Sequence, residues 1–300
     1  MRVLFALLLL TLPAVAQETS VDIQVRDDRH DPLRNAVATV GGCTGTLISN
    51  TVVLTAAHCL PPVFRAEKPP DAELAACKGL TQQSGLQKGS WEDPFTWYPS
   101  GSGQTPTLRL TFGDRRKKNR LVRKVTAYAL PRCADMALLR IRTTLPLYLA
   151  RPFPVASIPP LNPDRILAAN RLRYAGFGMP RIELAPAPVR QTGQVAYWGR
   201  NDCHVVGLPP NRSDGRRILP GDSGSPLLLE QAGREIMVGV LWGSGTPDRA
   251  ICGDVIPRQP DRHGSYTPTW RGSLEGTDAT DIGAWLRAMV PDAEHVALAP

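Results

Sequence analysis

Most of the chain consists of short segments in which apolar and polar residues alternate, or in which a few apolar residues follow one another, separated by turn residues. Both patterns are typical of β-strands. They predict strands at residues 37–40, 46–49, 52–55, 108–112, 121–129, 136–141, 171–175, 189–198, 226–229 and 236–242. No helical period runs through the middle, but Ile282, Trp285, Leu286 and Met289 fall on one face of a helix at residues 279–290. The pattern predicts an all-β protein with two barrels or sandwiches and a C-terminal α-helix.

Composition and proline spacing suggest how this domain is organised. The 29 Pro and 26 Gly residues favour many turns, and 42% apolar with 21% charged residues is usual for a globular protein. Residues 60–103 have little periodicity and are predicted to form an inserted loop region with a short helix near 71–77. The proline-spaced residues 145–163 are predicted to be the crossover between the two halves of a domain at 37–290, followed by a tail at 291–300.

Residues 1–16 have the features of a secretory signal peptide. Arg2 precedes a short apolar run, and a small-residue cleavage sequence ends at Ala16. A membrane anchor is the alternative, but the run is short for spanning a bilayer, and no later segment has 18 consecutive apolar residues. We therefore expect a secreted or periplasmic protein without a stable membrane anchor, with a polar N-terminal segment at 17–36 that is open to processing.

The cysteine count agrees with export. Six cysteines are an even number, which in an exported protein suggests three disulfides, and the sequence alone leaves 15 possible pairings. No Cys-x-x-Cys or His-Glu-x-x-His sequence occurs, so we expect no metal site.

The formal net charge of +8 includes a basic cluster at residues 115–120. A solvated loop is the favoured interpretation, with attraction to an acidic surface or a self-cleavage site as alternatives. The cluster has no interleaved aromatic residues, so we expect no nucleic-acid partner.

Three separated residues suggest nucleophilic catalysis. Ser223 lies between two glycines, His58 lies in a small-residue segment, and Asp135 begins an apolar run. A serine hydroxyl needs a base to take its proton, and an acid commonly orients that base. The chain order His-Asp-Ser is the order of chymotrypsin-type proteases. The Gly-x-Ser-x-Gly sequence of α/β-hydrolases is excluded, because Ser225 stands at its last position.

The chain resembles the trypsin/chymotrypsin-like serine proteases, and in particular their secreted bacterial members, from about residue 37 to residue 290. The resemblance rests on Cys43-Thr44-Gly45-Thr46-Leu47-Ile48, Leu54-Thr55-Ala56-Ala57-His58-Cys59, Asp135-Met136-Ala137-Leu138-Leu139, Gly176-Phe177-Gly178, Gly221-Asp222-Ser223-Gly224-Ser225-Pro226 and Trp242-Gly243. It implies two six-stranded antiparallel β-barrels with the active site in the cleft between them. It also implies that Ser223 is the nucleophile, His58 the general base and Asp135 the orienting acid.

The resemblance assigns further roles near Ser223. The backbone N–H groups of Gly221 and Ser223 would form the oxyanion hole. Asp222 corresponds to a buried acid that pairs with the α-amino group of a processed N-terminus. The usual Ile-Val-Gly-Gly start is missing here, so either Gln17 is the mature start or cleavage follows one of the arginines at positions 26, 29 and 34.

Around the substrate cleft the resemblance is less complete. Trp242, Gly243 and Gly264 correspond to substrate-binding positions, and Arg217 stands at the base of the primary pocket, where a preference for Lys or Arg would need an acid. Arg217 would favour acidic side chains or point to solvent. Leu241 replaces a serine that supports the triad acid in the family.

The same resemblance bears on the disulfides and the other histidines. Cys43 and Cys59 match a family disulfide, and Cys77–Cys133 and Cys203–Cys252 are the hypotheses for the remaining four cysteines. The histidines at positions 30, 204, 263 and 295 have no comparable context and are expected at the surface.

Two functional hypotheses follow. The first is an active secreted serine endopeptidase, monomeric and without a cofactor, acting on a protein or peptide substrate. The alternative is a weakly active or inactive homologue that serves as a binding or regulatory protein.

Overall fold

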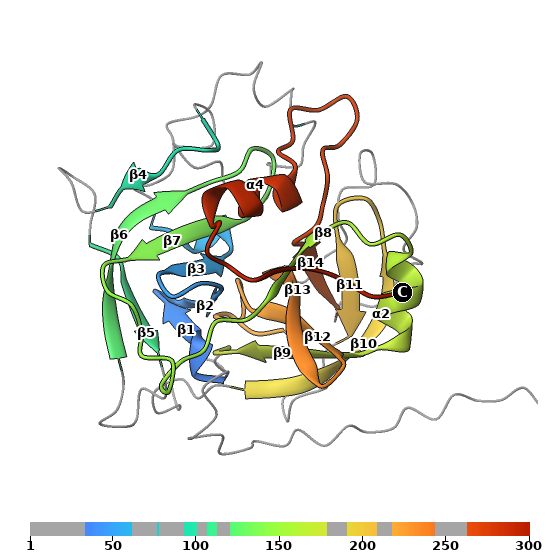
Figure 1. The fold of residues 1–300 in the computed structure, drawn as a ribbon, viewed down its shortest axis with the longest axis horizontal. Helices are drawn as coiled ribbons and strands as arrows, with labels where there is room; N and C mark the ends of the chain where they lie inside the picture. The colour runs from blue at the N-terminus through green and yellow to red at the C-terminus, as the bar shows by residue number, and fades with distance from the viewer. Residues whose placement is uncertain are drawn as a thin grey trace, which may run out of the picture.

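A computed structural model describes residues 34–61, 77, 93–100, 107–112, 121–178, 191–208, 218–243 and 263–300. Its strands form two sheets, and each sheet closes on itself (Figure 1). The all-β prediction with two six-stranded barrels and a C-terminal helix is therefore confirmed. The predicted signal peptide, the helix near 71–77 and the basic cluster at 115–120 lie outside the described residues.

The first barrel is a ring of six antiparallel strands in the order β6-β5-β1-β2-β3-β7, closed by pairing between β6 and β7. Its strands are β1 (Val37–Val40), β2 (Cys43–Leu47), β3 (Val52–Thr55), β5 (Arg109–Phe112), β6 (Leu121–Ala129) and β7 (Ala137–Ile141). The short β4 (Tyr98–Pro99) adds to β6 outside the ring. The 3₁₀ turns η1 (Arg34–Ala36) and η2 (Ala57–Cys59) precede β1 and follow β3.

The second barrel has the order β12-β9-β10-β11-β14-β13 and is closed by β12 and β13. Its strands are β9 (Arg171–Gly176), β10 (Gln191–Arg200), β11 (Val205–Leu208), β12 (Pro226–Gln231), β13 (Arg234–Gly243) and β14 (Gly264–Pro268). Two further strands, β8 (Val155–Ile158) and β15 (His295–Ala297), extend this sheet beyond β13 through parallel pairing.

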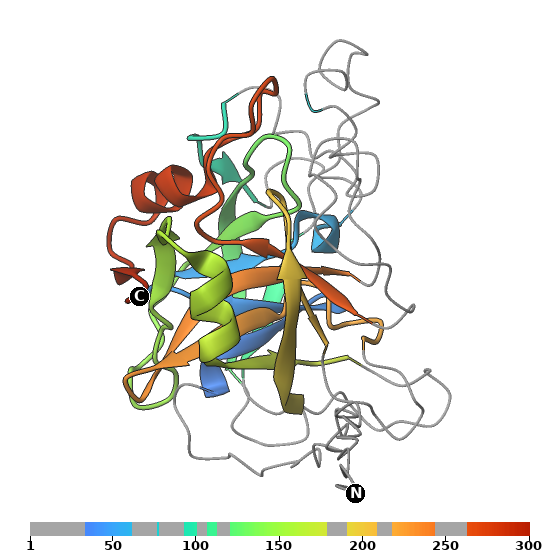
Figure 2. The same ribbon diagram turned by 90° about the vertical axis from the view of Figure 1, so that its right-hand side faces the viewer.

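Several of these elements were not predicted. The sequence analysis assigned residues 145–163 to a crossover, yet they contain β8, and α2 (Pro163–Ala169) begins at their end and contacts β9 and β10 (Figure 2). The helix begins because the Asn162 side chain accepts a hydrogen bond from the Arg165 N–H and proline stands in its first turn. Residues 291–300, expected as a tail, contain β15.

The predicted C-terminal helix is α4 (Ile282–Met289), which lies along β8. Asp281 caps its first turn by accepting a hydrogen bond from the Ala284 N–H at 2.7 Å. Its apolar face joins a core that also contains residues of both barrels, and Trp285 in that face is fully buried. Helix and core therefore fix the two barrels against each other. Among the described residues, no helix has the length and apolar character needed to cross a membrane.

Candidate active site

His58 and Asp135 meet because the strands that carry them are neighbours. His58 lies in η2 just after β3, and Asp135 lies just before β7, which pairs with β3. The Asp135 carboxylate accepts two hydrogen bonds from His58, from the main-chain N–H at 2.8 Å and from ring atom Nδ1 at 2.6 Å. Because an ionised carboxylate can only accept, Nδ1 carries the ring proton and Nε2 of the neutral ring is left as a base. The Asp135 side chain is 3% exposed and the His58 side chain 28%, so the base faces accessible space.

Ser223 is brought to the same place by main-chain contacts between the barrels. Its carbonyl oxygen accepts a hydrogen bond from the Thr44 N–H at 2.8 Å, and Cys59 Sγ lies 3.7 Å from the same oxygen. Cys59 directly follows His58 in sequence. The nucleophile candidate of the second barrel is thus tied to the segment that holds the base candidate of the first.

The loop around Ser223 needs glycine at two positions. Gly221 and Gly224 have φ of 98° and 81°, in the region that side chains disfavour. A Cβ at Gly224 would lie 2.1 Å from the Thr44 carbonyl oxygen, so a side chain there would push the loop off β2. Among the described residues, the N–H groups of Gly221 and Ser223 have no acceptor, whereas those of Asp222, Gly224 and Ser225 bond to main-chain oxygens. Within the described residues, these two N–H groups, on either side of Asp222, are available for a ligand oxygen.

The side chain of Asp222 anchors this loop to the neighbouring main chain. It is fully buried, and its carboxylate accepts hydrogen bonds from the N–H groups of Gly178 and Leu219, both at 2.9 Å. A Cβ at Gly178 would lie 2.3 Å from the carboxylate, so this position must be glycine for the contact to form. The family resemblance suggested a processed N-terminus, which lies outside the described residues, as one partner of this carboxylate. Neither main-chain donor was predicted, although the spacing of Gly176 and Gly178 was visible.

The geometry agrees with a comparison of sequence families. Residues 43–240, well over half of the chain, match the model of the trypsin-like peptidase domain. The chain belongs to this family. No curated protein matches it. The family resemblance inferred from the short motifs is therefore confirmed.

Two disulfides of this trypsin-like peptidase domain are as predicted. Cys43 is bonded to Cys59, beside His58, and Cys77 is bonded to Cys133, two residues before Asp135. Cys203 is also disulfide-bonded, but its predicted partner Cys252 lies outside the described residues.

One group of possible metal ligands occurs in the described part of the chain. It consists of Cys43, His58 and Cys59, whose ligand atoms lie within 4.8 Å of one another. Because the two sulfurs are joined in the disulfide, they offer no thiolates to a metal.

The predicted substrate-binding residues lie on adjacent strands. Trp242 and Gly243 end β13, and Gly264 begins β14, with Gly243 paired to Ser265. The register shifts at Trp242, a bulge of the kind that redirects a side chain. Leu241 is fully buried, and its main chain exchanges hydrogen bonds with Ser225 and Gly224. Arg217 lies outside the described residues.

His204 is the neighbour of Trp242, with ring centroids 5.8 Å apart. Burial lowers the pKa of His204 to about 3, and the positive charge of Arg271 acts in the same direction, so this ring is neutral at physiological pH. The expectation that the remaining histidines lie at the surface is wrong for His263, which is 2% exposed. His30 lies outside the described residues.

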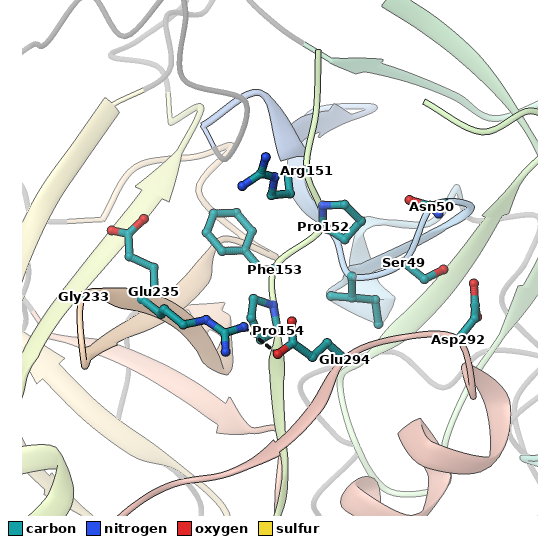
Figure 3. Close-up of a pocket in the computed structure, with 12 residues that line it drawn as sticks. Ser49, Asn50, Arg151, Pro152, Phe153, Pro154, Gly233, Glu235, Asp292 and Glu294 are labelled. Carbon is teal, nitrogen blue, oxygen red and sulfur yellow. Dashed lines mark hydrogen bonds and ion pairs between the residues drawn. The ribbon is translucent and has the colours of Figure 1, made fainter. Parts of the chain in front are cut away.

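A separate hollow of about 520 Å³ lies between the segment at residues 151–154, the turn between β12 and β13, and residues 292–294 (Figure 3). Charged side chains line it, including Arg234 and Glu294, which form an ion pair at 2.5 Å. No candidate active-site residue borders this hollow, so it is distinct from the site built around His58.

Proposed function

We propose that this trypsin-like peptidase domain is a secreted serine endopeptidase that cleaves peptide bonds through an acyl-enzyme. The observation that carries the proposal is the His58–Asp135 pair, in which the buried carboxylate fixes the ring proton on Nδ1. Ser223, held beside this pair through Thr44 and Cys59, would attack the substrate carbonyl.

Each group then has a defined part in the reaction. His58 Nε2 takes the proton of the Ser223 hydroxyl and later gives it to the leaving amine. Asp135 remains ionised and stabilises the imidazolium that forms in between. The N–H groups of Gly221 and Ser223, which have no acceptor among the described residues, donate hydrogen bonds to the carbonyl oxygen as it becomes negatively charged. In the second half of the reaction, His58 takes a proton from water, the water attacks the acyl-enzyme ester, and the product acid leaves Ser223 with its proton restored.

The disulfides support the compartment part of the proposal. Disulfides persist in oxidising surroundings and are rare in cytosolic proteins, and Cys43–Cys59 and Cys77–Cys133 both flank residues of the proposed triad. The two disulfides therefore favour an oxidising compartment, such as the one that secretion would provide.

A fluorophosphonate probe tests the proposal directly, because it reacts with an activated serine. We expect the wild-type protein to be labelled on Ser223, and Ser223→Ala to abolish labelling and to lower turnover of a peptide substrate on the order of a millionfold. Ser225→Ala is the matched control, since the Ser225 hydroxyl is buried two residues away with no hydrogen-bond partner among the described residues; it should be labelled normally. Absence of labelling in the folded wild-type protein would support instead the inactive binding protein on this fold.

A further inference from the structure

The turn that precedes Asp135 is held in an uncommon backbone conformation. Cys133 has φ of 54°, in the left-handed region that residues other than glycine seldom adopt, and it is 1% exposed. Conformations of this kind persist only where the surroundings hold them, and they gather at functional sites. Because Asp135 follows only two residues later, the contacts that fix the backbone of Cys133 also fix the position of the Asp135 Cα atom.

Besides the disulfide that joins Cys133 to Cys77, the contacts that hold this turn come from the segment at residues 271–281, between β14 and α4. Arg132 and Thr280 form a reciprocal pair: the Arg132 N–H donates to Thr280 Oγ1 at 2.8 Å, and the Thr280 N–H donates to the Arg132 carbonyl at 3.2 Å. Arg271 Nη1 donates to the Cys133 carbonyl at 3.2 Å, and Nη2 to the Thr280 carbonyl at 3.3 Å. Three main-chain groups of the turn are thus bonded to one segment from the other half of the chain.

Burying the charged side chain of Arg271 beside this turn costs desolvation free energy. It is 5% exposed, and a buried cation is unfavourable unless hydrogen bonds compensate for its lost hydration. Burial lowers its pKa to about 10, and Asp281 opposes this shift, so the guanidinium is still charged at neutral pH. The hydrogen bonds that compensate for its burial go to the turn itself and to Thr280.

The Asp135 carboxylate depends on this turn for its direction. Among the described residues its only hydrogen-bond partner is His58. Leu241, which stands where the family has a serine that supports this acid, has no hydroxyl group to donate. With no further donor from that side to orient the carboxylate, the main chain of the turn sets the angle at which it meets the imidazole.

We propose that Arg271 and Thr280 are positioning residues for Asp135, which fix the turn at residues 132–135 and through it the hydrogen bond from His58. This inference rests on the proposed function, since it assigns these two residues to the support of the triad acid. Neither residue touches the substrate in this scheme, and both act through Asp135.

Paired threonine variants test the inference. Thr280→Val removes the acceptor for the Arg132 N–H but keeps the side-chain shape, whereas Thr280→Ser keeps the hydroxyl. Thr277→Val is the matched control in the same segment, because within the described part of the chain Thr277 bonds to Leu274 and Ala279 and not to the turn. We expect Thr280→Val to lower kcat between about tenfold and a hundredfold with little change in KM, as small misplacements of catalytic groups do. Thr280→Ser should restore kcat, and Thr277→Val should leave it unchanged.

Two further readouts separate positioning from folding. The acid limb of the pH profile of kcat/KM should move to lower pH in Thr280→Val, because a poorly aligned carboxylate stabilises the charged imidazole less. The low-field proton NMR resonance of the His58–Asp135 hydrogen bond should shift in Thr280→Val and return in Thr280→Ser. Arg271→Lys keeps the positive charge but loses the forked pair of donors, so it should behave like Thr280→Val. It replaces Thr280→Val as the test variant if that protein does not fold.

The outcomes are distinct. A folded Thr280→Val or Arg271→Lys protein with unchanged kcat and an unchanged low-field resonance would overturn the inference. The resonance does not depend on turnover, so a shift in it would uphold the positioning role even if the wild-type protein proved inactive and the proposed function failed.

Discussion

At Asp222, one buried carboxylate couples the active-site loop to the neighbouring segment through two main-chain donors, Gly178 and Leu219. Replacing Gly178 by Ala would put a methyl group 2.3 Å from that carboxylate. We expect the carboxylate to move and the N–H groups of Gly221 and Ser223 to lose their alignment, which should lower kcat by about a hundredfold to a thousandfold, as loss of an oxyanion donor does. Gly199→Ala is the matched control, since nothing lies within 4 Å of a Cβ there. Steady-state kinetics on both purified variants checks this, and a fully active Gly178→Ala protein would contradict it.

His204 gives a pH prediction at the same scale. Its folded pKa of about 3 lies below the ordinary value of 6.5, through burial first and the Arg271 charge second. The unfolded chain therefore binds a proton between these two pH values that the folded protein does not, and the free energy of unfolding falls as pH falls from about 6.5 towards 3, by up to about 1.4 kcal/mol per pH unit. His204→Gln should reduce this fall, which urea unfolding at pH 7 and pH 4.5 measures. If the free energy of unfolding falls by the same amount between pH 7 and pH 4.5 in variant and wild type, the lowered pKa of His204 is not the cause.

Among the elements, β2 is tightly enclosed at Gly45 by the two strands that flank it. A Cβ at Gly45 would lie 2.7 Å from Val40 Cγ2 and 2.8 Å from Val53 Cγ1, side chains of the flanking β1 and β3. Gly45→Ala should therefore lower the free energy of unfolding by about 1–3 kcal/mol, the usual cost of overpacking. Gly42→Ala, at a position with nothing within 4 Å, should change it little. Chemical denaturation compares the two, and equal stabilities would show that β1 and β3 move apart at no cost.

The elements also show what sequence patterns can and cannot predict. The barrel strands at residues 121–129 and 137–141 were predictable because the first is long and the second is apolar except for Arg140. In contrast, α2 has seven residues and buries only Ile166 and Leu167, so it is too short for a helical period to appear. β8 was hidden in a proline-spaced stretch, because its parallel pairing with β13 and β15 leaves no turn signal beside it.

At the scale of the whole molecule, the candidate triad could be proposed from the sequence because each member sits in a short local motif whose chain order is distinctive. The residues that support the triad were not predictable. Thr44 bonds to the Gly221 carbonyl 177 positions away, and Arg271 to the Cys133 carbonyl 138 positions away. Such pairs carry no local pattern, since only the closed barrels bring them together. Of the two donors to Asp222, Gly178 was missed for the same reason, since it lies 44 positions away.

The C-terminal residues form the edge strand of the second sheet and provide the last prediction. β15 pairs with β8, the Glu294 carbonyl accepts from the Val155 N–H at 2.8 Å, and Leu298 is 6% exposed. Removing residues 294–300 should uncover β8 and lose the burial of Leu298, a side chain worth about 1.5–3 kcal/mol when fully buried. At roughly 2–4 °C per kcal/mol for a domain of about this size, Tm should fall by roughly 3–12 °C.

Removing the exposed Pro300 alone is the control for this truncation and should leave Tm unchanged. Differential scanning calorimetry on both truncations decides the matter, because the two proteins differ only in β15 and its immediate contacts. If the protein that ends at residue 293 has the same Tm as the wild-type protein, then β13 and α4 are sufficient to hold β8 in place. A fall with the expected size would make residues 291–300 part of the peptidase domain rather than a tail attached to it.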